Sequence, residues 1–203
     1  IKNPLASMVL FLSMLHDAKM RVKDRQYVEY IRFGVQTIDR IINNILSYTR
    51  PKTLALKEES ISRVVEEILD FMGPSISNRG IEVIYSVDYR DTLFFDPDMM
   101  KLVFMNLISN AIDAIKAKGI IRIDIKEDKG YIVITINDNG VGMADDVRKN
   151  IFNPFFTTKD KGVGLGLFIV HNIIHAHEGY IEVESQEGLG TTFYINLPKD
   201  RER

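Results

Sequence analysis

Two clusters of glycine, about twenty residues apart, constrain the fold of this chain more than any other feature. The first lies in Asp-Asn-Gly-Val-Gly-Met at 138–143, and the second is Gly-Val-Gly-Leu-Gly-Leu at 162–167. Glycine lets the backbone come close to a ligand, and the start of a helix presents unpaired N–H groups to an anion. Because a helical pattern follows the second cluster, we expect a phosphate-bearing ligand beneath the loop that joins them.

Residues 1–50 predict a helical hairpin. Apolar residues recur at alternating spacings of three and four, which is typical of a coiled-coil seam: Leu5, Met8, Leu12 and Leu15, then Val28, Ile31, Val35, Ile38, Ile42 and Ile45. The hairpin packs either onto its own domain or against a second copy as a four-helix bundle, and the regular seam favours the homodimer. Pro51 ends the second helix, so 51–59 is expected to be a linker.

Residues 60–203 predict a second domain of mixed elements. We expect helices at 60–73, 98–118 and 166–176, and strands at 81–87, 92–95, 120–126, 131–137, 180–185 and 191–197. The first helix is expected to kink or end near Gly73 and Pro74. Asp96-Pro97-Asp98 is expected to cap the second helix, and Gly119 to close it. Helices beside a mostly antiparallel sheet make a two-layer α/β sandwich, so the expected fold class is α+β.

The helix at 98–118 carries polar residues apart from its apolar face. Asn106, Asn110 and Asp113 follow one another at spacings of four and three. An amide oxygen suits a hard cation that also binds phosphate oxygens. Side chains bonded only to the neighbouring backbone explain the same pattern equally well, so both interpretations stay open.

Asp138 ends an apolar strand, where its carboxylate can accept a hydrogen bond from the exocyclic amine of a base. Gly140 and Gly142 let the chain turn beneath it, although such a sequence also forms simple turns. Lys159 follows an aromatic segment and can reach a terminal phosphate or remain in solvent. The second glycine cluster is neither a Rossmann fingerprint nor a P-loop, because it lacks the GxGxxG spacing, a preceding strand and a following Gly-Lys-Ser/Thr.

Composition excludes several other classes of protein. A net charge of −2 over 203 residues gives no electrostatic reason to expect nucleic acid or a membrane surface as partner. No apolar run approaches the ~20 residues of a membrane span. Without cysteine there is no thiolate metal site. His171, His175 and His177 have only Glu178 as a nearby further ligand, so we do not expect them to bind a metal.

Four elements follow one another along the chain: the polar face of the helix at 98–118, Asp138 with the first glycine cluster, the aromatic segment before Lys159, and the second glycine cluster. In this order they resemble the ATP-binding domain shared by sensor histidine kinases, type II topoisomerases, Hsp90 and MutL, known as the Bergerat fold. The resemblance covers about residues 60–197 and implies ATP and Mg²⁺ as ligands. It implies that Asn110 coordinates Mg²⁺, that Asp138 reads adenine, and that Asn106 and Lys159 act in catalysis. The other implied ATP-binding residues are Asp113, Gly140, Gly142, Phe156, Thr157, Gly162, Gly164, Leu165, Gly166, Leu167 and Thr192. The resemblance also implies that Phe155 and Phe156 anchor a lid at 143–162, and that Thr191 and Thr192 lie beside the adenine pocket.

Two features resemble sensor histidine kinases in particular. The related ATPases usually carry glutamate, a base for water, where this chain has Asn106, so transfer is favoured over hydrolysis. Ile-Lys-Asn-Pro-Leu at 1–5 resembles the back half of the histidine-kinase H box, typically His-Glu-Ile-Lys-Asn-Pro-Leu, of the nitrogen-regulation type. A Bergerat-fold ATPase, a serine kinase of mitochondrial type, and a nucleotide-sensing dimer module without kinase activity are the alternatives.

This resemblance implies a γ-phosphoryl transfer from ATP to a histidine and then to an aspartate of a response regulator. The phosphoacceptor His and its Glu would precede Ile1, so the chain as given is not expected to phosphorylate itself at that site. The implied partners are a second copy through 1–50, a response-regulator receiver domain and an upstream sensor domain. The implied location is the cytoplasm, either free or as the cytoplasmic part of a membrane-bound sensor.

Overall fold

The structure, a computed structural model, describes residues 54–159 and 162–200. The predicted hairpin at 1–50 lies outside these residues. The helices are α3 (Ile61–Asn78), α4 (Pro97–Ala114), α5 (Asp145–Arg148) and α6 (Gly166–Ala176). The strands are β1 (Lys57–Ser60), β2 (Ile81–Val87), β3 (Thr92–Phe95), β4 (Gly119–Asp128), β5 (Tyr131–Asp138), β6 (Tyr180–Gln186) and β7 (Gly190–Pro198).

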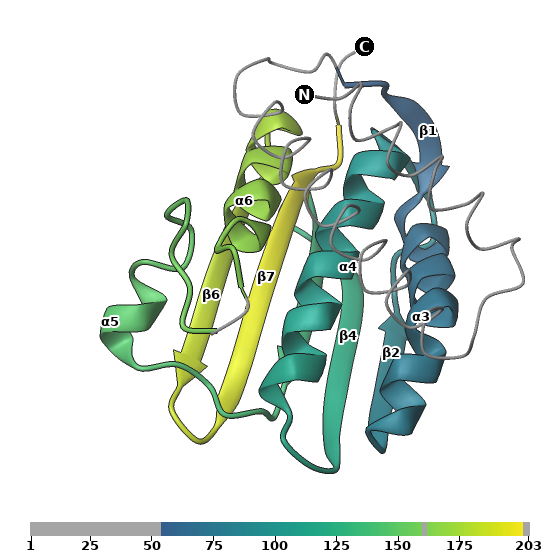
Figure 1. The fold of residues 1–203 in the computed structure, drawn as a ribbon. Coiled ribbons are helices and arrows are strands. Elements are labelled where there is room, and N and C mark those ends of the chain that lie inside the picture. The colour runs from purple at the N-terminus through teal and green to yellow at the C-terminus, as the bar shows by residue number, and fades with distance from the viewer. Residues whose placement is uncertain (1–53, 160–161, 201–203) are drawn as a thin grey trace, which may run out of the picture. The chain divides into compact units, whose positions relative to one another are not determined.

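Five strands form the main sheet, in the order β2-β4-β5-β7-β6. The β2–β4 pair is parallel and the other pairs are antiparallel. Helices α3, α4 and α6 lie on one face of this sheet (Figure 1). The predicted two-layer sandwich and the predicted α+β class are confirmed for the described part of the chain. None of the helices in that part is long and apolar enough to cross a membrane.

The core lies between the sheet and the three helices because apolar residues alternate along the central strands. Side chains on a strand point to opposite faces in turn, and the helix-facing set is buried. This set comprises Ile121, Ile123, Ile125, Ile132, Ile134, Ile136, Phe193, Ile195 and Leu197. Helix α4 contributes Val103, Leu107 and Ile108 to the same core, each at most 1% exposed. Its opposite side is therefore free to carry polar residues.

Two predicted helix ends are wrong. Helix α3 continues through Pro74 to Asn78, because burial of Ile76 at 5% exposure stabilises the last turn despite the hydrogen bond that proline removes. Helix α4 ends at Ala114 rather than near 118, since Ile115 turns into an extended conformation and is itself buried. Gly119 begins β4 and does not close the helix.

The expected linker at 51–59 contains the start of a strand. Strand β1 pairs with β3 in a separate two-stranded antiparallel sheet, with Lys57 opposite Phe95 and Ser60 opposite Thr92. The sequence Lys-Glu-Glu-Ser has little intrinsic preference for a strand. Its pairing with the apolar Thr-Leu-Phe-Phe strand decides its conformation, and this partner is not visible from the local sequence.

A buried hydrogen-bond network joins α6 to the start of α4. Asp96 caps α4, and its Oδ1 accepts from the N–H groups of Asp98 and Met99. The Asp96 N–H donates to Nε2 of His177 at 3.0 Å, and His177 Nδ1 lies 2.7 Å from the Ile173 carbonyl oxygen. With Nε2 accepting, the Nδ1 proton is directed to Ile173 and the imidazole is neutral. His177 therefore fixes α4 relative to α6.

Replacing His177 with alanine is expected to lower the free energy of unfolding by about 2–4 kcal/mol, because it leaves a cavity and an unpaired Asp96 N–H. Urea unfolding of residues 54–203 followed by circular dichroism measures this loss. His175→Ala is the matched control, since His175 is exposed on the same helix. Equal stability of the two variants would contradict the structural role of His177.

Candidate functional site

Asp138 is a buried carboxylate at the end of a central strand. It lies opposite Ile121 of β4 and Thr191 of β7, on the helix-facing side of the sheet, and is 5% exposed. Its Oδ1 accepts from the Gly140 N–H at 2.8 Å. Burial raises the pKa of the Asp138 carboxyl, while backbone hydrogen bonds from Gly140 and Thr191 oppose that rise. A carboxylate has about four lone-pair sites, so two donors leave it able to accept from a ligand.

The first glycine cluster holds this end of β5 against its neighbours. A Cβ at Gly140 would lie 2.7 Å from the Cβ of Ala114 at the end of α4. At Gly142 the backbone has φ +63°, and a Cβ would overlap the Gln186 carbonyl oxygen. These two glycines therefore permit close packing of protein backbone. Any contact with a ligand is additional to that role.

The two threonines after the last glycine turn lie on opposite faces of the sheet. Thr191 shares the face of Asp138, and its Oγ1 is 2.9 Å from the Ser185 hydroxyl. Thr192 pairs with Asn137 on the other face, where its Oγ1 accepts from Asn137 Nδ2 at 2.8 Å. Of the two threonines that the resemblance implies, the structure thus brings Thr191 to Asp138 and leaves Thr192 on the other face of the sheet.

Asn106 of α4 faces the start of α6. Its Nδ2 donates to the Leu102 carbonyl oxygen at 2.7 Å, so the interpretation of a side chain bonded to its own backbone holds for this nitrogen. Its Oδ1 lies 2.7 Å from the point where a Cβ at Gly166 would stand. Because residue 166 is glycine, the Asn106 amide oxygen can lie close to the backbone at the start of α6.

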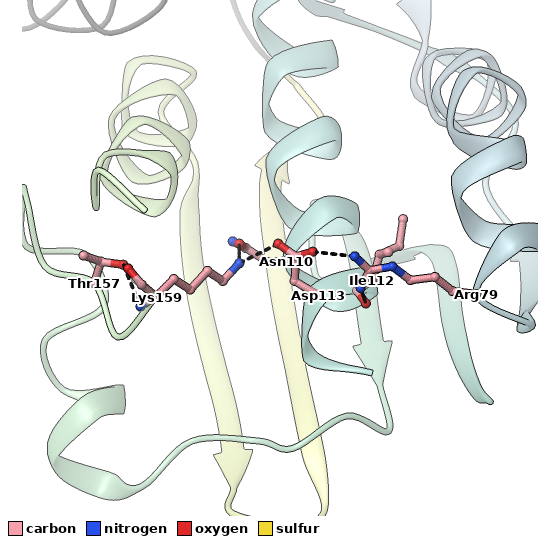
Figure 2. A network of polar contacts seen from close by, with 6 residues as sticks. All are labelled: Arg79, Asn110, Ile112, Asp113, Thr157 and Lys159. Carbon is pink, nitrogen blue, oxygen red and sulfur yellow. Dashed lines mark hydrogen bonds and ion pairs between the residues drawn. The ribbon is translucent and has the colours of Figure 1, made fainter. Parts of the chain in front are cut away.

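Lys159 reaches across to α4 while its side chain stays half-exposed to solvent (Figure 2). Its Nζ donates to Asn110 Oδ1 at 3.0 Å and to Asp113 Oδ2 at 2.9 Å. The Asn110 amide oxygen therefore faces a positive charge, which is the orientation that a metal ligand requires. Thr157 supports this arrangement, because its Oγ1 accepts from the Lys159 N–H at 3.0 Å.

Arg79 also contacts Asp113, and the sequence did not predict this contact. Its Nη2 lies 3.4 Å from Asp113 Oδ1, and its Nη1 donates to the Ile112 carbonyl oxygen at 2.8 Å. The residue follows the end of α3, about thirty positions before its partners. An arginine in a polar turn carries no local signal for such a contact.

The second glycine cluster packs on the segment that precedes it. Gly164 has φ +71°, and a Cβ there would overlap the carbonyl carbon of Phe155. A Cβ at Gly162 would lie 2.6 Å from Thr157 Oγ1. Phe156 packs against the core as expected for an anchor, whereas Phe155 is 63% exposed. The cluster therefore packs closely against residues 155–157.

Leu165 and Leu167 serve packing in this structure. Leu165 is 7% exposed, and Leu167 is partly buried against the core. Their contribution to ligand binding would come from the backbone.

The three histidines near the end of α6 do not come together. His177 is buried in the network described above, and the rings of His171 and His175 are 6.4 Å apart. Within residues 54–159 and 162–200, no group of three His, Cys, Asp or Glu side chains could hold a metal ion. A metal here would need amide oxygens together with oxygens of its ligand or water, a set that suits Mg²⁺.

The comparisons with known families match both parts of the chain. Residues 95–201 match the family described as "Histidine kinase-, DNA gyrase B-, and HSP90-like ATPase", and residues 1–54 match the "His Kinase A (phospho-acceptor) domain". Sensor histidine kinase ZraS of Escherichia coli (strain K12) is 34% identical over 200 residues. These cover 98% of this chain and 43% of ZraS, so the chain spans less than half of that relative.

Two solved structures are also similar. Full-length ShkA in complex with AMPPNP has a TM-score of 0.85 and 25% identity, covering 97% of this chain and 43% of that chain. Histidine kinase ThkA in complex with response regulator protein TrrA has a TM-score of 0.72 and 25% identity, covering 98% of this chain and 58% of that chain.

Proposed function

The chain belongs to the sensor histidine kinases, with a His Kinase A region followed by the ATPase-like domain, and from this premise we propose that it binds ATP with Mg²⁺ and transfers the γ-phosphoryl group to a histidine. The buried carboxylate of Asp138, on the same side of the sheet as the amides of α4, is the observation that carries the proposal. AMPPNP in the similar ShkA structure supports it.

Asp138 would read the adenine base. An ionised carboxylate accepts strongly from the exocyclic amine, and its buried setting excludes competing water. Thr191 would lie beside the base, since it shares the face of Asp138 and already bonds to Ser185. Of the two threonines that the resemblance implies, we assign this role to Thr191 alone, because Thr192 lies on the other face of the sheet.

The phosphate end of ATP would lie between α4 and the start of α6. Asn110 Oδ1 would hold the Mg²⁺ that neutralises the phosphate oxygens, with Asn106 Oδ1 close by. The backbone N–H groups of Gly166 and Leu167 at the start of α6 and the Lys159 ammonium would bind the phosphates. Positioning and charge neutralisation then account for most of the catalysis.

Transfer rather than hydrolysis follows from the chemistry of Asn106. An amide cannot take a proton from water, and its nitrogen already donates to the Leu102 carbonyl oxygen. A Bergerat-fold ATPase would need a base at this place. The match of residues 1–54 to a domain described as phospho-acceptor also favours the kinase, because a domain of this kind is a target for phosphoryl transfer.

The partners of the kinase belong to the same proposal. We infer a homodimer through the seam of residues 1–50, and a receiver domain as the next phosphoryl acceptor, as the complex of ThkA with TrrA suggests. An upstream sensor domain would supply the signal. The segment that matches the His Kinase A domain contains one histidine, His16. We infer from the H-box resemblance that the acceptor histidine precedes Ile1.

The proposal is tested by incubating two proteins with γ-labelled ATP: the chain as given, and the chain preceded by His-Glu. The longer protein is expected to acquire label that is labile to acid and stable to base, and the same protein with Gln in place of the added His is expected to acquire none. Label on the chain as given that disappears in His16→Gln would contradict the inferred acceptor. Steady phosphate release without labelled protein would support an ATPase instead.

A further inference from the structure

The contacts of Lys159 raise a question about the order of events at Asn110. The ammonium lies 3.0 Å from the same amide oxygen that would hold the metal ion, and it is held there by Asp113 (Figure 2). Asn110 and Asp113 are three residues apart on α4 and so project from the same side of the helix. Both side chains thus bind one cationic group.

The Asp113 carboxylate is itself fixed in place. One oxygen contacts Lys159 at 2.9 Å, and the other lies 3.4 Å from the Arg79 guanidinium, which also donates to the Ile112 carbonyl oxygen. Arg79 therefore attaches the carboxylate to the α4 backbone. The backbone of Lys159 is also fixed, because its N–H donates to Thr157 Oγ1. The position of the ammonium over Asn110 is determined from both sides.

We propose that Lys159 and the divalent cation compete for the Asn110 amide oxygen, with Asp113 and Arg79 holding Lys159 in the competing position. The inference rests on the proposed role of Asn110 as a ligand of the nucleotide-bound Mg²⁺. Two positive charges on one oxygen repel each other, so the arriving cation displaces the ammonium. The displaced Lys159 becomes available to the terminal phosphate, which couples metal binding to the delivery of this lysine.

The competition is expected to be modest in size. Lys159 and Asp113 are 48% and 41% exposed, and solvent screens an ion pair of this kind. Exposed pairs of this kind change an equilibrium by about two- to fivefold. The quantity to measure is therefore the ratio of nucleotide affinity with Mg²⁺ to nucleotide affinity without it. A change that affects both affinities equally cancels from this ratio.

The test measures ADP affinity by calorimetry with and without Mg²⁺, using the full chain. ADP is chosen because it lacks the terminal phosphate that Lys159 is proposed to contact. The Mg²⁺ enhancement factor is expected to rise by about two- to fivefold in Lys159→Met and in Asp113→Asn, and no further in the double variant. Lys149→Met is the matched control: it removes an exposed lysine that pairs weakly with Asp145, at 3.9 Å, and should leave the factor unchanged.

An unchanged or smaller factor in Lys159→Met would overturn the competition, as would equal increases in Lys159→Met and Lys149→Met. Asn110→Ala separates this result from a failure of the proposed function. It is expected to lose most of the Mg²⁺ enhancement and to be insensitive to Lys159→Met. Full enhancement in Asn110→Ala would refute the metal role of Asn110 itself.

Discussion

Asp138→Asn is expected to weaken ATP binding by about 10- to 100-fold, equivalent to ~1.5–3 kcal/mol for a hydrogen bond to a charged group. The amide presents one acceptor oxygen, without charge, to the adenine amine, and its nitrogen is a donor that meets another donor. Calorimetry with Mg²⁺-ATP measures the change. Asp128→Asn is the control, since Asp128 is exposed at the other end of the β4–β5 pair. Unchanged affinity in Asp138→Asn would rule out the adenine role.

The same substitution is expected to leave the fold at least as stable at neutral pH. The pKa of Asp138 is raised by burial, so its contribution to stability is present below the unfolded pKa and is lost as pH rises through the folded value. At pH 7 the ionised carboxylate is thus a cost to folding that asparagine avoids. ATP affinity has the opposite dependence and should fall as pH decreases through that raised pKa. If Asp138→Asn lowered the urea midpoint of unfolding as well as the ATP affinity, this prediction would be contradicted.

Gly142→Ala is expected to lower the free energy of unfolding by about 2–5 kcal/mol, combining a left-handed backbone with a steric clash. The added Cβ would overlap the Gln186 carbonyl oxygen and would lie 3.0 Å from that of Gly190, and neither atom belongs to a side chain that can rotate away. Urea unfolding measures the loss.

Gly130→Ala isolates the backbone part of that effect. Gly130 also has a positive φ, +82°, but no atom of the described residues lies within 4 Å of the point that an added Cβ would occupy. Only the ~1–2 kcal/mol of left-handed strain is therefore expected. The difference between the two variants measures the close approach of the first glycine cluster to the β6–β7 turn. Equal decreases in the free energy of unfolding of the two variants would show that this close approach does not contribute to stability.

The elements with a strong periodic pattern were predictable from the sequence. Alternating apolar residues indicated the strands around Ile123, Ile134 and Ile195, and the capping Asp96 indicated the start of α4. The predictions that were wrong concerned elements whose conformation depends on partners distant in the sequence. Strand β1 exists because β3 pairs with it, and α3 passes Pro74 because Ile76 finds a buried place. The local sequence predicts neither of these contacts.

The candidate site shows the same division. Asp138, Asn106 and Asn110 could be singled out because polar residues interrupt apolar patterns. The choice between Thr191 and Thr192 depends on strand register, which places residue 191 and not 192 opposite Asp138. The alternation of side chains along β7 would have shown that the two threonines differ, but the pairing with β5 was needed to say which one joins the site. Arg79 had no signal at all.

Helix α4 is attached at both ends, and this would let the proposed site select its ligands by size. Its start is fixed through Asp96 and His177, and the carbonyl oxygen of its last residue, Ala114, accepts from the Val141 N–H at 3.1 Å. From Asn110 to Ala114 the helix rises ~6 Å. One rigid element therefore sets the separation between the group that would contact the base and the groups that would contact the phosphates. Ligands that are too short to span this separation forfeit one set of contacts.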